Sequence, residues 1–583
     1  MGNKGTLSHQ TVRENLQKVQ AFMAQQKLDA FYVSSFDVFL NEYVPLTDNL
    51  RYFFSAFTGS MAEMIIPRQG KARLYVDGRY HEQADQEVPL EIVEVVKCTP
   101  TDPVQTRLLE DVAALKGKLG VVAERTALGL FKRMAKLTTL EAFTEGEVDQ
   151  LVGIKAAEAP PTVELVEREL RGRDTLEKTA LCCPTDQHGL FLTALDQIAW
   201  VTNCRGYHLP FLSSFKARAL VTRKKVYVFV SPETPIQEKA QKTAGIEWLK
   251  LETRALGREL ARLQNTLLLD HVAFDPAQLN CADFTTLLNV FHPERLKEVS
   301  GGLVEHMSIK EPAEIRAMEK SFEKSDRAIV KTIRWVKENI AAGKRLTELD
   351  LFHQTRVFYD AEGARELSFN TIAGVGPNAS IIHYGSPSDQ VTIKDDDMIL
   401  LDSGGYFAAG FATDTTRTFF ASPKGEANPQ HKKIYTLVLK GLLQCQSAVF
   451  PEGTKGNVLD GICRGPLLRE GFNYAHGTGH GVGIHVHEDG VRLSLISNVP
   501  MKAGQVVSIE PGIYLPGQAG VRLENIAVVE KHPQHAGMLC FRPLTQIGFD
   551  PNLIDAGMLN SDEVKWLRDY EAICEKRGTS LKA

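Results

Sequence analysis

Apolar and polar residues follow the same order twice in the N-terminal half of the chain. Residues 28–77 hold an apolar segment, a turn, an aromatic stretch and two further apolar segments separated by a basic turn. Residues 189–232 repeat that order, with TRKK at the hairpin turn. The apolar segments predict strands, and the spacing of apolar residues in 11–26 and 235–252 predicts helices. We therefore expect two related α/β domains.

The second half has another order, two helices followed by strands, and this order also occurs twice. Residues 312–340 and about 347–361 have helical spacing, and strands are predicted at 369–377, 380–385 and 398–405. A second helix pair at about 428–450 and 456–470 precedes predicted strands at 481–489, 506–515 and 520–531. This duplication predicts one sheet built from two similar halves, with helices covering one face.

Three domains are expected from the length and from two breaks in composition. A chain of 583 residues is too long for one hydrophobic core, which stops growing at roughly 250–300 residues. Residues 156–162, AAEAPPT, suggest one boundary, and VSGG followed by KEPAE near residues 299–314 suggests another. The predicted division is 1–158, 159–308 and 309–583, in a fold of the α/β (α+β) class.

Composition excludes several classes of function. The formal net charge of −5 leaves no basic excess for a nucleic acid partner. No run approaches 18 apolar residues, so no membrane span is expected. The nine cysteines are scattered, odd in number and without a C-x-x-C pair, which argues against a disulfide framework or a thiolate zinc site. A reducing compartment, the cytoplasm, is therefore expected.

Acidic residues form two matching pairs in the second half. Asp402 and Asp414 lie twelve positions apart in LLDSGGYFAAGFATD, and Glu510 and Glu524 lie fourteen apart. Each pair lies on predicted strands joined by a connection that contains glycine. An even separation keeps a pair in phase if the connection returns the chain in register. We expect that it does, so that four carboxylates converge on one sheet face.

Four converging carboxylates indicate a metal site. Like charges in a low-dielectric environment repel strongly unless cations neutralise them or protons bind. Hard oxygen ligands with one imidazole suit Mn²⁺ or a similar divalent ion, and carboxylates can bridge two ions roughly 3.5–4 Å apart. The imidazole is expected from YAHGTGHGVGIHVHED, which contains His476, His480, His485 and His487.

This histidine segment differs from the zincin motif despite its H-x-x-x-H spacing. Gly477 and Gly479 disfavour a helix, and no glutamate lies between the two histidines. The alternation in VGIHVHED instead predicts a strand on which His485 and His487 share one face.

Each of these residues alone has a simpler interpretation. An aspartate at a strand end often caps a turn, and a buried glutamate often pairs with an arginine such as Arg417 or Arg522. His383, His485 and His487 are individually typical of hydrogen-bonded core residues. Other chemistries lack residues, because GVGPNA at 374–379 has no helix after it to bind a pyrophosphate, and neither a P-loop nor a G-x-S-x-G elbow occurs.

Taken together, the motifs resemble a known family. LLDSGGYFAAGFATDTTRT, HGTGHGVGIHVHE, IEPGIY and VRLENIAVV are similar, in order and spacing, to the catalytic domain of the pita-bread metallopeptidases, and most closely to aminopeptidase P. FNTIAGVGPNASIIHYG resembles the stretch that supplies the first active-site histidine of that family. RYFFSAFTGSMAEMIIP, LYVDGRYHEQA and TALDQIAWVTNCRG resemble the two N-terminal domains of its long form, and residues 540–575 resemble its C-terminal extension.

The resemblance implies two creatinase-like α/β domains, a pita-bread catalytic domain and a set of site residues. Asp402 would bind one metal, Asp414 and Glu524 would bridge both metals, and His480 and Glu510 would complete the other. Two divalent ions are implied, with Mn²⁺ preferred and Zn²⁺ or Co²⁺ as alternatives. The remaining expected roles are transfer of a proton by Glu510, stabilisation of the intermediate by His383 and His487, lining of the substrate pocket by His476, and orientation of a ligand carboxylate by Arg522.

The implied activity is hydrolysis of the N-terminal Xaa-Pro peptide bond by a metal-activated hydroxide. Peptides with proline at the second position would be the substrates, and a homodimer is expected. Prolidase, which has the same ligands but accepts only dipeptides, is the alternative enzyme, and the three expected domains with the C-terminal extension argue against it. A metal-free pita-bread binding protein is a further alternative, which the presence of all five ligands disfavours.

Overall fold

The computed structural model describes residues 7–154, 160–422 and 426–582. It divides into two compact units, one made of residues 1–165, 173–210 and 214–303, and one made of residues 166–172, 211–213 and 304–583. The predicted domain boundary between 158 and 159 lies outside the described residues, and the division into three domains stays a prediction. Among the described residues, no helix is long and apolar enough to cross a bilayer.

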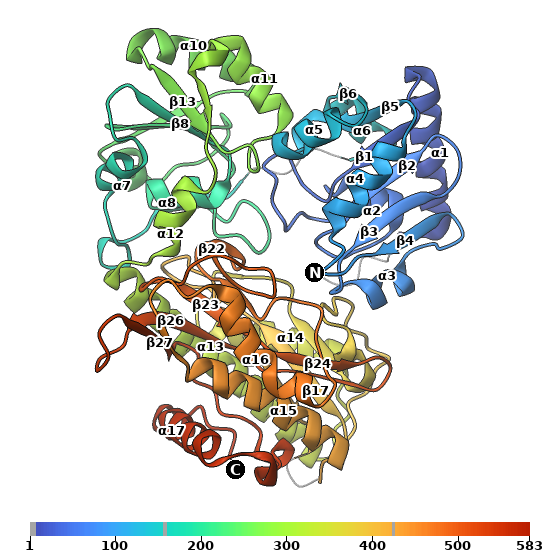
Figure 1. Ribbon diagram of the computed structural model, residues 1–583, viewed down its shortest axis with the longest axis vertical. Coiled ribbons are helices and arrows are strands. Elements are labelled where there is room, and N and C mark those ends of the chain that lie inside the picture. Colours follow the sequence, from blue (N-terminus) through green and yellow to red (C-terminus); the bar gives the residue numbers. More distant parts are fainter. Residues whose placement is uncertain (1–6, 155–159, 423–425, 583) are drawn as a thin grey trace. The chain divides into compact units, whose positions relative to one another are not determined.

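The first unit contains two six-stranded sheets with the same topology (Figure 1). In the first sheet the order is β4-β3-β2-β1-β5-β6, where β1–β2 and β2–β3 are antiparallel and the other neighbours are parallel. In the second sheet the order is β12-β11-β10-β8-β13-β14, with the same directions at the matching positions. The predicted duplication of an α/β domain is therefore confirmed.

The strands of these sheets are short. They are β1 (Ala30–Val33), β2 (Glu63–Pro67), β3 (Ala72–Val76), β4 (Val93–Lys97), β5 (Lys118–Val122), β6 (Thr139–Phe143), β8 (His188–Leu192), β10 (Arg218–Thr222), β11 (Val226–Val230), β12 (Ile246–Lys250), β13 (His271–Phe274) and β14 (Leu296–Glu298). A further two-stranded sheet pairs β7 (Glu164–Leu165) with β9 (Cys204–Arg205).

The helices of the first unit include one confirmed and one wrong prediction. Helix α1 (His9–Gln26) begins after Ser8, whose side chain accepts a hydrogen bond from Thr11 N, and it confirms the predicted helix. Residues 235–252 instead hold the short α9 (Glu238–Gln241) and strand β12, because Gly245 adopts a φ of +81° and the next residues pair with β11. The other helices are α2 (Leu50–Ser55), α3 (His81–Glu87), α4 (Val104–Ala114), α5 (Leu128–Ala135), α6 (Glu145–Val152), α7 (Thr175–Cys182), α8 (Leu195–Thr202), α10 (Leu256–Leu267) and α11 (Cys281–Val290).

The second unit repeats two helices followed by strands, as predicted. The first half holds α13 (Pro312–Ala341), α14 (Glu348–Ala361), β15 (Glu366–Leu367), β16 (Ile372–Val375), β17 (Met398–Ser403), β18 (Gly405–Tyr406) and β19 (Thr415–Phe420). The second half holds α15 (Pro429–Gln446), β20 (Val449–Pro451), α16 (Gly456–Arg469), β21 (Gly479–Gly481), β22 (Glu488–Leu493), β23 (Val506–Ile509), β24 (Gly512–Leu515), β25 (Ala519–Arg522), β26 (Asn525–Lys531) and β27 (Met538–Pro543). Helix α12 (Gly302–Ser308) precedes the first half, and α17 (Ser561–Arg577) follows the second.

The strands of the second unit form more than the single sheet that was predicted. A three-stranded sheet, β16-β17-β19, belongs to the first half, and a six-stranded sheet, β20-β27-β26-β23-β21-β22, belongs to the second. Two small sheets pair β15 with β18 and β24 with β25. The two halves are joined by a backbone hydrogen bond from Glu524 N, directly before β26, to Thr416 O, the second residue of β19, at 3.1 Å. The predicted strand at 380–385 is wrong, because that segment continues a 3₁₀ turn.

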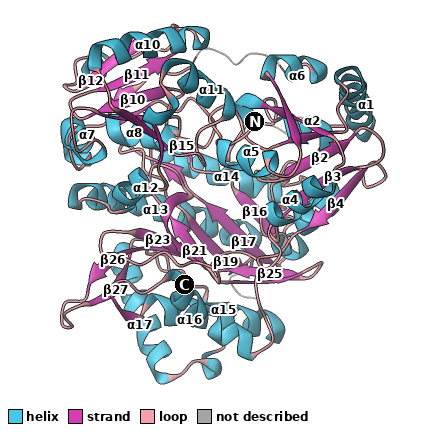
Figure 2. Cartoon of the chain, turned by 45° about the horizontal axis from the view of Figure 1, so that its top comes forward, coloured by secondary structure: helices cyan, strands magenta, loops and turns pink. Residues whose placement is uncertain are grey.

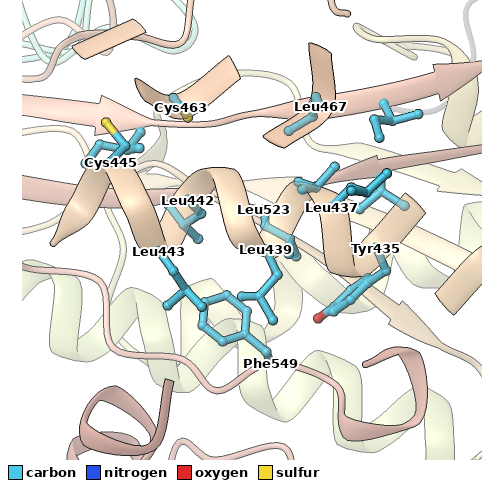
Figure 3. Close-up of a cluster of buried hydrophobic side chains, with 14 of the residues drawn as sticks. Tyr435, Leu437, Leu439, Leu442, Leu443, Cys445, Cys463, Leu467, Leu523 and Phe549 are labelled. Atoms are coloured by element: carbon cyan, nitrogen blue, oxygen red, sulfur yellow. The ribbon is translucent and has the colours of Figure 1, made fainter. Parts of the chain in front are cut away.

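Helices α15 and α16 pack together against these strands, and Figure 2 shows them in cyan beside the magenta arrows. Figure 3 shows the apolar side chains that join them, including Leu439 and Leu467 from the helices and Leu523 from the strand region. Leu523 is completely buried in this cluster. Because Leu523 stands between Arg522 and Glu524, its burial holds both polar neighbours in place.

Candidate metal centre

The four predicted acidic ligands lie at matching ends of two antiparallel strand pairs. Asp402 lies in β17 opposite Thr416 of β19, and Asp414 directly precedes β19. Glu510 directly follows β23 and Glu524 directly precedes β26, at the end where Ile509 pairs with Asn525. Both connections therefore return the chain in register, as the even spacings required.

The structure brings these acids together with His480. One ligand atom each of Asp414, His480 and Glu524 lies within 4.8 Å of the others. His480 Nε2 is 3.4 Å from Asp414 Oδ2 and also 3.4 Å from Glu510 Oε1. Strand β21 carries His480, whose backbone N–H donates to Ser508 Oγ at 2.9 Å, while Ser508 Oγ donates to Glu510 Oε1 at 3.2 Å. Ser508 therefore sets the position of His480 relative to Glu510.

Burial and mutual repulsion disfavour ionisation of Asp414, Glu510 and Glu524 in the protein alone. Asp414 is 5% exposed and Glu524 is 1% exposed. Burial, then the charges of Asp402 and Glu510, raise the pKa of Asp414 well above its usual range. Burial and the charges of Asp414, Glu510 and Asp402 raise the pKa of Glu524 in the same way, and burial raises the pKa of Glu510 to about 7. Such a cluster binds positive charge strongly.

Two carboxylate oxygens in the cluster test whether a metal ion fits. Asp402 Oδ1 and Glu524 Oε1 are buried and have no hydrogen-bond partner among the described residues. A buried, unpaired carboxylate oxygen is costly, and native proteins satisfy nearly all such atoms. Carboxylate oxygens with one imidazole are the donor set that hard divalent cations prefer. The residues present therefore fit divalent metal binding.

Arg522 supplies the protein's own positive charge beside this cluster. Its Nη2 donates to Asp402 Oδ2 at 2.6 Å, and its Nε donates to Thr416 Oγ1 at 2.9 Å. Thr416 Oγ1 in turn donates to Glu524 Oε2 at 3.0 Å. One arginine and one threonine thus hold one oxygen each of Asp402 and Glu524 and leave the opposite oxygens to a ligand.

Tyr514 connects Arg522 to His476. The Tyr514 hydroxyl accepts from Arg522 Nη1 at 2.9 Å and lies 2.9 Å from His476 Nε2. His476 Nδ1 lies 2.7 Å from Gly477 O, and this contact makes Nδ1 the donor and Nε2 the acceptor. The sequence did not single out Tyr514, Thr416 or Ser508, although Tyr514 stands in IEPGIY and Thr416 lies two residues after Asp414.

The other predicted histidines also lie near the cluster. The rings of His480 and His487 are 4.5 Å apart between centroids and nearly perpendicular. His485 is next to His487, with 6.3 Å between ring centroids. Ile382 O accepts a hydrogen bond from Arg522 Nη1 at 3.2 Å, so the turn that carries His383 also contacts the site.

The predicted strand over VGIHVHED is wrong, because residues 483–487 form bends and β22 begins only at Glu488. Glu488 folds back over Gly483, where an added Cβ would lie 1.8 Å from Glu488 Oε2. The same carboxylate oxygen accepts from Ile484 N at 3.2 Å. The side chain of Glu488, in place of a neighbouring strand, thus binds the backbone N–H of Ile484. Because residues 483–487 form no strand, His485 and His487 do not share a strand face.

Comparisons with known proteins cover nearly the whole chain. A family model described as metallopeptidase family M24 matches residues 316–531, and one for the C-terminal region of peptidase_M24 matches 537–581. Two models described as the creatinase/prolidase N-terminal domain match residues 15–151 and 161–314.

Curated relatives share about a third of the residues. The chain is 32% identical over 600 residues to the probable Xaa-Pro aminopeptidase P of Laccaria bicolor, a match that covers 98% of this chain and 91% of that protein. It is 31% identical to the probable Xaa-Pro aminopeptidase P of Aspergillus niger, with 96% of this chain and 94% of that protein covered.

Among solved structures, the X-prolyl aminopeptidase of Caenorhabditis elegans, described as a cytosolic enzyme with a di-nuclear active site, matches with a TM-score of 0.87. That match has 24% identity and covers 98% of this chain and 96% of the other, so it shows a shared fold. The Xaa-Pro dipeptidase of Bacillus anthracis matches 64% of this chain and 98% of its own, with a TM-score of 0.54.

Proposed function

The chain belongs to metallopeptidase family M24, among relatives named Xaa-Pro aminopeptidase P, and we propose that it hydrolyses the peptide bond between an N-terminal residue and proline. The observation that carries this proposal is the buried cluster of four carboxylates with His480, in which two carboxylate oxygens have no hydrogen-bond partner among the described residues. Such a cluster needs cations to be stable in the ionised form. The enzyme is therefore a metal-dependent hydrolase.

Two divalent ions would be held by the five residues around the cluster. Asp402 would bind one ion, His480 and Glu510 the other, and Asp414 and Glu524 both. The di-nuclear site described for the Caenorhabditis elegans enzyme supports two ions, and the carboxylate-rich donor set favours Mn²⁺ over softer metals, with Zn²⁺ and Co²⁺ as alternatives. Bound divalent ions supply Lewis acidity, which polarises a carbonyl and lowers the pKa of water.

The protein's own residues then handle protons and orient the substrate. Glu510 is held by Ser508 and its side chain is 17% exposed, so its carboxylate can accept a proton from water and return it. His487, next to His480, and His383 are proposed to donate hydrogen bonds to the oxygen that gains negative charge and to assist the departing proline nitrogen. His476, oriented by Tyr514, is proposed to contact the substrate, and Arg522 to orient Asp402.

The substrate class follows from the relatives. In a peptide bond that precedes proline, the proline nitrogen carries no hydrogen and the proline ring fixes φ. Such a bond therefore requires a dedicated enzyme. The Bacillus anthracis dipeptidase matches only 64% of this chain, whereas the aminopeptidase P relatives match 96% or more. Both of these relatives, which match nearly the whole chain, are named probable Xaa-Pro aminopeptidase P, and this favours the aminopeptidase over the prolidase alternative.

The experiment that tests this function compares a tripeptide and a dipeptide. Purified protein is freed of metal with a chelator, loaded with Mn²⁺, and incubated with Arg-Pro-Pro or with Arg-Pro. Release of arginine from the tripeptide, only after loading, supports the aminopeptidase. Cleavage of Arg-Pro alone supports a prolidase. No cleavage, together with no metal by elemental analysis, supports a metal-free binding protein.

Compartment and assembly are part of the same proposal. The cytosolic description of the Caenorhabditis elegans enzyme and the nine free cysteines support the cytoplasm. A homodimer is supported by exposed apolar side chains on α16 and on the segment after β22, namely Val458, Ile462, Leu468, Leu495 and Ile496. Light scattering of the purified protein measures the mass in solution and tests the dimer.

A further inference from the structure

Helix α16 carries a buried ion pair that touches none of the five proposed metal ligands. Asp460 and Arg464 lie one helical turn apart, 0% and 2% exposed. Arg464 Nε donates to Asp460 Oδ1 at 3.0 Å and to Oδ2 at 2.9 Å. The arginine is thereby fixed in one orientation, with its remaining N–H groups directed away from its own helix.

Those N–H groups bind the segment that leads to His480. Arg464 Nη1 donates to Asn473 Oδ1 at 2.7 Å and to Tyr474 O at 2.8 Å, and Nη2 donates to His476 O at 2.7 Å. The guanidinium also lies over the Tyr474 ring, 3.7 Å from its centroid. One side chain therefore holds three of the four residues 473–476 through their backbone or side-chain oxygens.

Asp460 extends this network to the site itself. Its Oδ1 accepts from Thr478 Oγ1 at 2.6 Å, and the Tyr474 hydroxyl lies 2.5 Å from the same Thr478 oxygen. The carbonyl of Thr478 accepts from Glu510 N at 2.8 Å. Thr478 thus joins the ion pair on α16 to the backbone of Glu510, and it stands two residues before His480.

Close packing leaves this segment little freedom to adjust. A Cβ added at Gly479 would lie 1.9 Å from Ser508 O, so the backbone between Thr478 and His480 lies directly on β23. A displacement of residues 473–478 therefore moves His480 and Glu510 as well. Because the desolvation of a buried ion pair offsets most of its attraction, stability alone gives little reason for such a pair.

We propose that the Asp460–Arg464 pair positions the metal centre by holding residues 473–478, which set His480, Glu510 and the substrate-side His476. This inference rests on the proposed metal-dependent function. Neither residue touches the reacting atoms, so both are positioning residues. Lysine cannot replace the arginine, because one ammonium group does not reach Asp460, Asn473 and the two carbonyls in a planar arrangement.

The test measures Mn²⁺ affinity by calorimetric titration of chelator-treated protein. The variants are Arg464→Lys, Arg464→Met and Asp460→Asn. The matched control is Lys440→Met, which breaks another largely buried ion pair of the same unit. In that pair, Lys440 Nζ of α15 donates to Glu563 Oε2 of α17 at 2.6 Å. Thermal unfolding of each variant reports the loss of stability separately.

Removal of a group that orients a metal ligand typically weakens metal binding 10–100-fold. We expect weakening of that size in Arg464→Lys and Asp460→Asn, and unchanged affinity in Lys440→Met at a similar unfolding temperature. A second readout is kcat at saturating Mn²⁺, which should stay reduced because His476 has moved. If Arg464→Met does not fold, Arg464→Lys, which keeps the positive charge, decides the test.

Two results would overturn the inference in distinguishable ways. A folded Arg464→Lys protein that binds Mn²⁺ within threefold of the parent affinity, with unchanged kcat, would show that the pair serves the fold alone. A parent protein that binds no Mn²⁺ and cleaves no Arg-Pro-Pro would refute the proposed function, and the inference with it.

Discussion

Removing the charge of Glu510 should stabilise the metal-free protein, and Mn²⁺ should offset most of that gain by stabilising the parent more than the variant. Burial raises the pKa of Glu510 to about 7 from an ordinary value of 4.5. A carboxyl group whose pKa is raised on folding contributes stability below pH 4.5, and this contribution is lost as the pH rises through 7. At pH 8 the folded, metal-free chain therefore bears the full cost of ionising Glu510.

The size of that cost follows from the shift. A shift of 2.5 pKa units corresponds to about 3 kcal/mol at 1.36 kcal/mol per unit. Glu510→Gln should raise the free energy of unfolding of the metal-free protein by up to about 3 kcal/mol at pH 8, and by only about 1 kcal/mol at pH 5.5. With about 2.1 cal/mol/K of unfolding entropy per residue, the pH 8 gain raises the unfolding temperature of the second unit by about 5 °C.

Mn²⁺ should reduce this difference between the two proteins. At a free concentration 100-fold above the dissociation constant, binding stabilises the parent by about 2.7 kcal/mol, whereas the variant lacks a ligand and gains less. Differential scanning calorimetry at pH 8 and pH 5.5, with chelator or with Mn²⁺, measures both effects.

Glu63→Gln is the matched control. Burial also raises the pKa of Glu63 to about 7, but Glu63 lies in the first unit and accepts a hydrogen bond from the Tyr32 hydroxyl at 2.6 Å. The control should therefore show the same pH dependence, and its difference in stability from the parent should not change with Mn²⁺. A Glu510→Gln protein that is less stable than its parent without metal at pH 8 would refute the reasoning about carboxylate repulsion.

Three further changes test other parts of the account. Asp414→Asn replaces a proposed bridging anion by a neutral amide. Metal content by elemental analysis should therefore fall below one ion per chain, and turnover should fall at least 100-fold. Two retained ions with full activity would contradict the bridging role. His487→Ala should lower kcat about 10- to 100-fold while metal content stays unchanged, and loss of metal would instead make His487 a ligand. Asp326→Asn should raise the free energy of unfolding by up to about 4 kcal/mol at pH 8.5 and by less than half as much at pH 5. Burial raises the pKa of Asp326 to about 7, so the stability that this group contributes below pH 3.8 is lost as the pH rises through 7. Denaturant titrations at the two pH values measure the difference.

Regular patterns in the sequence predicted the elements that depend on local spacing. The long helix from Pro312 and the duplicated sheets of the first unit have strong periodicity, and both are confirmed. The even acid spacing places each pair in phase only if the connection returns in register, and the expected register is observed in both strand pairs. The long helix and the duplicated sheets depend on the spacing of residues along the chain, so a single sequence is enough to predict them.

Tertiary contacts decided the elements that were predicted wrongly. The alternation around His485 indicated a strand, but Glu488 binds that backbone with its side chain. Residues 246–250 have helix-like spacing, yet they add to the edge of an existing sheet beside β11. Tyr514 and Arg464 act through partners far along the chain or on another element, and such partners leave no local pattern.

The most direct test of the central claim is anomalous diffraction from a crystal of the Mn²⁺-loaded protein. We expect two Mn²⁺ peaks per chain among Asp402, Asp414, His480, Glu510 and Glu524. A folded, fully loaded protein with no anomalous density among these five residues would contradict it.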